Sequence, residues 1–320
     1  MKMGKRMVKK IALEEHFLDP ATVDYWRPTM VDVAPKKTAE LYAALTDFGD
    51  QRLAMMDKTG IARAVLAIAG PGVQAERDTA TAIRNARASN DFLAEEMQKR
   101  PDRYSGFAHL AMQDAKAAAD ELERCMRELK FCGAMIDGHT HGKYLDDRSY
   151  DPFWERAAAL DAAIYLHPAD PVTQPPALAG YNVLARPMWG WGVETGSHAL
   201  RIICGGVFHR YPKAKLLLGH LGETLPFQLW RFDSRSAPYG WNLPKPPSQY
   251  LKENVWVTTS GMYDLPPLRC SLDALGRDHV MFSADYPFDW PGCEFIDTVA
   301  IDENLRADVA YNNAAKLLKL

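Results

Sequence analysis

Short apolar runs recur eight times along this chain, and longer segments of helical character separate them. The runs occupy residues 8–13, 63–69, 104–110, 132–136, 163–166, 215–219, 255–260 and 280–284. They are continuously apolar rather than alternating, which is typical of strands covered on both faces of a parallel sheet. The intervening segments are rich in Ala, Glu, Arg and Leu, and their helical periodicity covers residues 79–100, 115–129, 151–160, 193–211, 224–234, 266–275 and 305–318.

Eight strand and helix units predict an α/β fold of the closed (β/α)8, or TIM-barrel, type. We expect a single domain over residues 1–320, because a chain of this length can enclose one large core. An open doubly wound sheet is the alternative, although no Gly-x-Gly-x-x-Gly motif or phosphate-loop lysine supports it. Two insertions, residues 19–47 and 237–248, are expected to form lids or subunit contacts at the carboxyl-terminal face.

Charge and composition argue against several classes of partner. The 38 basic and 41 acidic side chains are interspersed and leave a net charge of −3, which gives nucleic acid no binding surface. The first ten residues are basic, but the apolar stretch that follows is too short for a signal peptide, and no segment is long enough to span a membrane. Five scattered cysteines without a C-x-x-C pair predict free thiols in a cytoplasmic protein.

Three of the apolar runs lead into side chains that can bind a metal. Glu14 and His16 follow the first run, His167 follows the fifth, and Asp285 follows the eighth. Because the carboxyl ends of parallel barrel strands share one rim, these side chains are expected to converge. Alternate residues of a strand face the same side, which groups Glu14 with His16 and leaves Glu15 facing away. Two imidazoles and two carboxylates suit a divalent ion of intermediate hardness.

A second group of polar residues follows the sixth run. His220 and Glu223 stand three residues apart, so the carboxylate can orient or charge the imidazole for proton transfer or anion binding at neutral pH. An ordinary carboxylate at a helix amino terminus is the alternative for Glu223. Arg231 could hold a substrate anion through two hydrogen bonds, and a plain surface arginine is its alternative.

The remaining histidines are weaker candidates. His139 and His141 have the spacing of a ligand pair but lie in a polar loop after the fourth run, which favours pocket lining over metal binding. His109, late in the third run, could also line the pocket. Structural roles are expected for the three histidines in predicted helices or at their ends, His198, His209 and His279.

Several motifs carry a family resemblance across nearly the whole chain. They are LEEHF at 13–17, YLHP at 165–168, GVETGSHALR at 192–201, GHLGE at 219–223, WRFD at 230–233, VTTSG at 257–261 and FSADYPF at 282–288. Together they resemble the amidohydrolase-related family of aromatic acid decarboxylases, which act on γ-resorcylate and kindred hydroxybenzoates. The resemblance implies a small aromatic carboxylic acid as substrate, no organic cofactor, and a homo-oligomer, either a dimer or a tetramer.

The same resemblance implies one divalent ion, manganese in preference to zinc or magnesium, with four protein ligands: Glu14, His16, His167 and Asp285. Substrate binding and the proton network would fall to His220, Glu223, Arg231 and Phe288. Some relatives that act on 5-carboxyvanillate or 2,3-dihydroxybenzoate have Ala in place of His16, so the histidine favours γ-resorcylate. The segment at 138–146 is instead more similar to carboxyvanillate enzymes, which leaves those substrates as alternatives.

For such a substrate, loss of carbon dioxide is expected to follow protonation of the ring carbon by Asp285, because direct loss would leave an unstable aryl carbanion. A metallohydrolase of a lactone, amide or ester is the competing enzyme class, with Asp285 as the base for water. The binuclear members of that class usually begin with His-x-His and carry a lysine after the fourth strand, whereas this chain has Glu-x-His and Met-Ile-Asp-Gly. A non-catalytic barrel is a third alternative, which would not need the ligand set.

Overall fold

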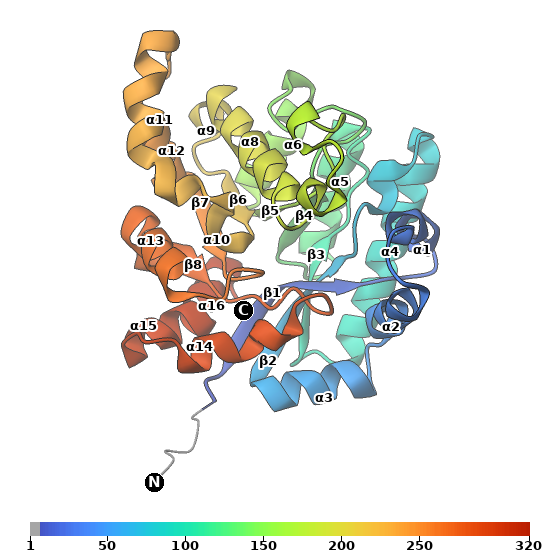
Figure 1. The fold of residues 1–320 in the computed structure, drawn as a ribbon. Helices are drawn as coiled ribbons and strands as arrows, with labels where there is room; N and C mark the ends of the chain where they lie inside the picture. The colour runs from blue at the N-terminus through green and yellow to red at the C-terminus, as the bar shows by residue number, and fades with distance from the viewer. Residues whose placement is uncertain (1–6) are drawn as a thin grey trace.

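The computed structural model describes residues 7–320, in which eight strands form one parallel sheet in sequence order (Figure 1). The strands are β1 (Lys10–Phe17), β2 (Ile61–Ile68), β3 (Tyr104–Ala108), β4 (Gly133–Asp137), β5 (Ala163–His167), β6 (Lys215–Leu218), β7 (Val255–Thr258) and β8 (Val280–Met281). Each overlaps a predicted run, which confirms the α/β barrel. The first six residues of the basic start lie outside the described part of the chain.

The barrel closes where the chain after β8 returns to β1. The backbone N–H of His16 donates to the carbonyl of Tyr286 at 2.8 Å, and Glu15 pairs with Tyr286 in a parallel bridge. The N–H of Glu14 also donates to the Ser283 hydroxyl at 2.7 Å. These contacts rule out the open doubly wound sheet and bring the residues that follow β8 beside the end of β1.

Helices surround the sheet and connect its strands. They are α1 (Val23–Trp26), α2 (Pro35–Thr46), α3 (Asp50–Thr59), α4 (Thr79–Lys99), α5 (Ala115–Arg127), α6 (Asp151–Ala159), α7 (Asn182–Ala185), α8 (Gly190–Cys204), α9 (Val207–Arg210), α10 (His220–Glu223), α11 (Leu229–Ser236), α12 (Pro247–Asn254), α13 (Leu265–Leu275), α14 (Phe295–Thr298), α15 (Glu303–Ala307) and α16 (Asn313–Leu318). Within residues 7–320, none of the helices combines the length and the apolar character that a membrane crossing requires.

Three predicted helices are interrupted, namely those at 193–211, 224–234 and 305–318. Gly206, at a φ of 70°, separates α8 from α9, because its left-handed backbone cannot continue a right-handed helix. Thr224 is also left-handed, with a φ of 65°, and a 3-10 turn follows it, so α11 begins only at Leu229. A π-helical turn over Asp308–Asn312 separates α15 from α16.

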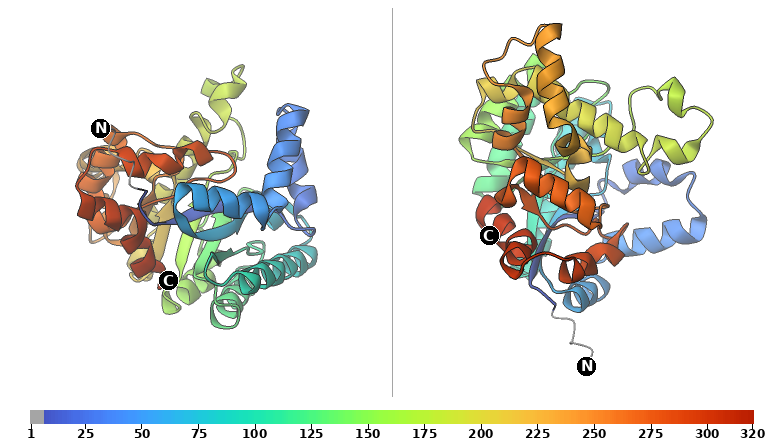
Figure 2. Two further views of the ribbon diagram at one scale, coloured as in Figure 1. Left: turned by 90° about the horizontal axis from the view of Figure 1, so that it is seen from below. Right: turned by 60° about the vertical axis from the view of Figure 1, so that its left-hand side comes forward.

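The predicted insertion at 19–47 contains α1 and α2, and the one at 237–248 holds a 3-10 turn, Ala237–Tyr239, before α12. The sequence reading missed a third insertion, residues 168–189 between β5 and α8. Figure 2 shows this insertion and the α1–α2 segment projecting from the same side of the barrel. Both follow carboxyl ends of strands, so they stand at the rim where the predicted site residues are located.

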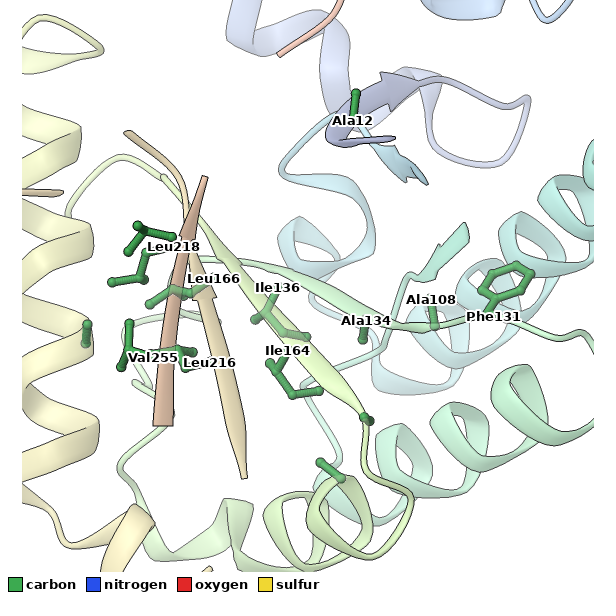
Figure 3. Close-up of a cluster of buried hydrophobic side chains, with 14 of the residues drawn as sticks. Ala12, Ala108, Phe131, Ala134, Ile136, Ile164, Leu166, Leu216, Leu218 and Val255 are labelled. Atoms are coloured by element: carbon green, nitrogen blue, oxygen red, sulfur yellow. The ribbon is translucent and has the colours of Figure 1, made fainter. Parts of the chain in front are cut away.

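Apolar side chains fill both faces of the sheet, as the continuous runs predicted. Figure 3 shows one cluster, in which Ile164 and Leu166 of β5 pack with side chains of neighbouring strands and with the surrounding helices. Tyr165, between them, belongs instead to a separate buried cluster with Leu13 and Leu217. Successive residues of a strand face opposite sides, so the first cluster lies outside the barrel and the second lies within it.

Candidate metal centre

Four side chains converge at the carboxyl-terminal rim, as the sequence predicted: Glu14, His16, His167 and Asp285. One ligand atom from each lies within 4.8 Å of the others. His16 Nε2 is 3.2 Å from Asp285 Oδ1, and His167 Nε2 is 3.5 Å from Glu14 Oε1. Three separate strand ends, those of β1, β5 and β8, therefore supply one compact cluster.

The ligand atoms of this cluster fit a cation. Among the described residues, Glu14 Oε1, His16 Nε2 and Asp285 Oδ1 are buried polar atoms without a hydrogen-bond partner. Buried polar atoms are otherwise almost always paired, so three unpaired atoms that face one another are arranged to share one cation. Carboxylate oxygens and imidazole nitrogens together suit manganese or zinc.

A register shift in β1 turns the first two ligands inward. Ile11 and Leu13 belong to the cluster inside the barrel, while Ala12 belongs to the outer one. Strict alternation would place Glu14 outside with Ala12. The pairing of β1 with β2 shifts between Ala12 and Glu15, and such a shift inserts a residue and redirects the side chains that follow. Glu14 and His16 consequently share the inner side.

Side chains from β5 and from the chain just after β7 hold Glu14 from behind. The Tyr165 hydroxyl donates to Glu14 Oε2 at 2.5 Å, and the Ser260 hydroxyl donates to the same oxygen. Both hydroxyls are buried, so Oε2 is fixed and Oε1 is directed at the cluster. Burial raises the pKa of Glu14, but the imidazoles of His220, His167 and His16 outweigh it and lower the pKa overall. The carboxyl group is therefore ionised, as a metal ligand must be.

Glu15 faces away from the cluster, as predicted, yet it is also buried. Its carboxylate accepts the N–H of Ala284 at 3.0 Å, which fixes the backbone next to Asp285. Burial raises the pKa of Glu15 to about 8. Asp285 itself has a left-handed φ of 56°, a conformation that costs a non-glycine residue energy and is concentrated at functional sites.

His220 and Glu223 form a pair beside the cluster. His220 Nδ1 is 2.7 Å from Glu223 Oε1, and the two residues enclose Leu221 and Gly222, which also have left-handed φ values. Burial lowers the pKa of His220, but the charge and hydrogen bond of Glu223 outweigh it and raise the pKa to about 10. The imidazole is thus positively charged at neutral pH. Glu223 is buried against this cation and is not a solvated carboxylate at the start of a regular helix.

The other predicted site residues lie further out. The ring of Phe288 is 5.7 Å from that of His16 and is 39% exposed, which places it at the mouth of the site. Arg231 is exposed on α11, and no contact between it and the cluster is recorded for the described residues. His139 is partly buried against Tyr144, and His141 is exposed. Neither histidine belongs to the cluster.

The structural histidines have ordinary roles. His198 is buried and its Nε2 accepts the N–H of Leu145 at 2.8 Å, while burial lowers its pKa to about 3. His279 stacks on Trp256. His109 is buried and its Nε2 accepts the N–H of Val73, so it is held within the fold near the site.

Sequence reasoning missed several polar residues around the cluster. Asp137, at the end of β4, lies 3.2 Å from His167 Nδ1. Asp289 lies near Asp285 and His220, and burial raises its pKa. Asp137 follows an apolar run, as the four proposed ligands do, so the same pattern could have identified it. Nothing in the local sequence distinguishes Tyr165 or Ser260 as a site residue.

A closed parallel barrel with an imidazole and carboxylate cluster at its carboxyl-terminal rim defines a metal-dependent enzyme. The chain belongs to the amidohydrolase family, whose model matches residues 23–320. It is 40% identical to γ-resorcylate decarboxylase of Polaromonas sp. strain JS666, over 97% of this chain and 98% of that protein.

Solved structures agree with this membership. A 2,6-dihydroxybenzoate decarboxylase in complex with 2,6-dihydroxybenzoate has a TM-score of 0.93 and 37% identity, over 98% of this chain and 100% of that one. A dihydroxybenzoic acid decarboxylase from Polaromonas sp. JS666, with bound manganese and the inhibitor 2-nitroresorcinol, has a TM-score of 0.90 and 39% identity, with 98% of each chain covered.

Proposed function

We propose that this protein is a metal-dependent, non-oxidative decarboxylase of ortho-hydroxybenzoates, with γ-resorcylate as the favoured substrate. The observation that carries the proposal is the Glu14, His16, His167 and Asp285 cluster beside the hydrogen-bonded pair of His220 and Glu223. Full-length similarity to γ-resorcylate decarboxylases supports the reaction and this substrate. By the family resemblance, the presence of His16 favours the same substrate over its alternatives.

One divalent ion, manganese in preference to zinc or magnesium, would be held by the four cluster residues. When bound, it supplies positive charge that neutralises and orients the carboxylate and the adjacent oxygen of the substrate. The positive charge of His220, maintained by Glu223, attracts the same anionic substrate from the side. The Phe288 ring at the mouth of the site supplies an apolar contact for the aromatic ring. No organic cofactor is required for this reaction.

Asp285 is proposed to donate the proton. Its carboxylate would take up a proton from water and pass it to the ring carbon that bears the substrate carboxylate, which leaves Asp285 ionised again, while electron density from the ortho oxygen stabilises the ring that has lost its aromaticity. The bond between that carbon and the carboxylate then breaks, and its electron pair returns to the ring as carbon dioxide leaves. Proton transfer before bond cleavage avoids an aryl carbanion, whose lone pair cannot be delocalised into the ring.

Arg231 is proposed to bind the substrate anion in an assembled homo-oligomer, a dimer or a tetramer. Large apolar side chains near Arg231 are exposed in the single chain, with Phe227 at 84% and Trp230 at 75%. Exposed apolar clusters of this kind are typical of surfaces that contact another protein. Light scattering of the purified protein measures the subunit number directly, and a monomer under assay conditions would contradict this part of the proposal.

A panel of hydroxybenzoates tests the reaction. We expect 2,6-dihydroxybenzoate to be decarboxylated, as followed by ultraviolet absorbance and carbon dioxide release, while meta-hydroxy isomers that cannot present adjacent oxygens are inert. His167→Ala should lose both the ion and the activity. Hydrolysis of lactones, amides or esters without activity on any hydroxybenzoate would replace this proposal with a metallohydrolase, and full activity in metal-free protein would refute the metal dependence.

A further inference from the structure

Asp137 is a buried carboxylate for which the proposed reaction gives no role. It ends β4 and its side chain is almost fully enclosed. Among the described residues, neither its carboxylate oxygens nor the facing His167 Nδ1 has an aligned hydrogen bond. An uncompensated buried carboxylate is costly for a fold. Within residues 7–320, its one ion pair is with His167, whose Nδ1 lies 3.2 Å from Oδ1.

His167 stands between this carboxylate and the cluster. Its Nδ1 faces Asp137, and its Nε2 lies 3.5 Å from Glu14 Oε1. A neutral imidazole has one N–H and one lone pair, so a proton held at Nδ1 leaves the lone pair on Nε2 for a metal. His16 is arranged in the same way, because its Nδ1 lies 3.2 Å from the carbonyl oxygen of Ile68.

The surrounding structure is shaped to admit this carboxylate. A Cβ atom at Gly70 would lie 2.6 Å from Asp137 Oδ1, so only glycine leaves the necessary space. Gln74 holds the backbone of Asp137 from both sides, accepting its N–H at 2.7 Å and donating to its carbonyl oxygen at 3.2 Å. His109 also faces Asp137, but the pKa of this histidine is lowered by burial, so it supplies no compensating cation.

We propose that Asp137 is a positioning residue: its carboxylate, 3.2 Å from His167 Nδ1, favours the tautomer that carries its proton on Nδ1 and the ring orientation in which Nε2 binds the metal. The inference deepens the proposed function, because it rests on the same metal site. Carboxylates that orient a ligand histidine typically change metal affinity by about 10- to 100-fold when removed.

Metal titration of three variants tests the proposal. In Asp137→Ala, the apparent Kd for Mn²⁺, measured by competition with a chelator, should rise about 10- to 100-fold. Asp137→Asn keeps the shape but offers a neutral amide that can donate to Nδ1 and favour the wrong tautomer, so its Kd should rise similarly. The matched control is Asp297→Asn, which neutralises another buried carboxylate, 2.9 Å from Lys10 Nζ at the amino-terminal end of β1.

The Asp137 variants and Asp297→Asn should differ in opposite directions in melting temperature and in metal affinity. Without metal, the Asp137 variants should melt at or above the wild-type temperature, because they lose an uncompensated buried charge. Asp297→Asn should melt lower and keep wild-type metal affinity. A Kd within twofold of wild type in both Asp137 variants would overturn the inference, and so would two ions per wild-type chain with one lost in Asp137→Ala, which would make Asp137 a ligand. Substrate takes no part in these measurements, so failure of the decarboxylase proposal is recognised separately.

Discussion

The two hydroxyls behind Glu14 offer a quantitative test of how the metal site is held. Tyr165→Phe removes the donor 2.5 Å from Glu14 Oε2, and Ser260→Ala removes the other donor to that oxygen. A hydrogen bond to a charged group contributes about 1.5–3 kcal/mol to stability. In each single variant Oε2 retains one donor. We therefore expect each substitution to lower the free energy of unfolding by about 1.5 kcal/mol, the lower end of that range.

The double variant should lose more free energy of unfolding than the two single variants lose together. With both hydroxyls removed, Oε2 becomes a buried oxygen without a side-chain donor, and the pKa of Glu14 should move upward because the hydrogen bonds that favour its ionised form are gone. Contacting residues that share a partner typically couple by about 0.5–3 kcal/mol. A further loss of about 1.4 kcal/mol in metal binding would correspond to a tenfold higher Kd.

Competition with a chelator for Mn²⁺ measures the metal affinity of each variant, and thermal unfolding of the metal-free protein measures its stability. Thr258→Val is the matched control, because the Thr258 hydroxyl contacts those of Tyr165 and Ser260 at 2.7 and 3.1 Å and has no recorded contact with Glu14. We expect it to change the metal Kd by less than about threefold. Strictly additive effects in the double variant, or a control that weakens metal binding as much as Tyr165→Phe, would refute this account of the site.

Three further outcomes are expected. Asp285→Asn should lower kcat by about 10²- to 10⁴-fold with substrate affinity within about tenfold of wild type, and turnover in heavy water by the wild type should place deuterium on the carbon that lost carbon dioxide. Wild-type turnover by this variant at normal metal occupancy would shift the proton role to His220. His198, with a pKa near 3 in the fold against 6.5 when unfolded, contributes stability above pH 6.5 that is lost as pH falls toward 3. His198→Gln should therefore lose less stability than wild type between pH 6.5 and 4 in denaturant titrations, and an equal loss would contradict the neutral state of this histidine. Gly70→Ala should displace the Asp137 carboxylate and weaken Mn²⁺ binding without any change of charge, whereas unchanged affinity would show that the site has room to adapt.

The strands and the clustering of the four proposed ligands were predictable because they follow from local composition and from one rule of topology. Continuous apolar runs identify buried parallel strands, and the carboxyl ends of such strands meet at one rim. Glu14, His16, His167 and Asp285 could therefore be grouped before any contact was known. The pairing of His220 with Glu223 was equally accessible, because it depends on a spacing of three residues.

The remaining features depend on interactions that composition does not encode. The register shift that turns Glu14 inward arises from pairing between β1 and β2. Because the run is apolar on both faces, its hydrophobic pattern does not reveal an inserted residue. Tyr165 and Ser260 approach Glu14 from other strands, so their roles follow from register across the barrel. The break at Gly206 was a local signal that helical periodicity on both sides concealed.

The closure of the barrel between β8 and β1 also dictates when the metal site can exist. Glu14 and His16 are synthesised long before Asp285, because β1 and β8 lie at opposite ends of the strand order. A nascent chain on the ribosome therefore lacks one of the four proposed ligands until β8 and Asp285 have emerged. Before then, Glu14, His16 and His167 cannot form the complete cluster. If the four residues bind one ion as proposed, a chain stalled before β8 should be recovered without it, and a chain that extends past Asp285 should be able to bind it.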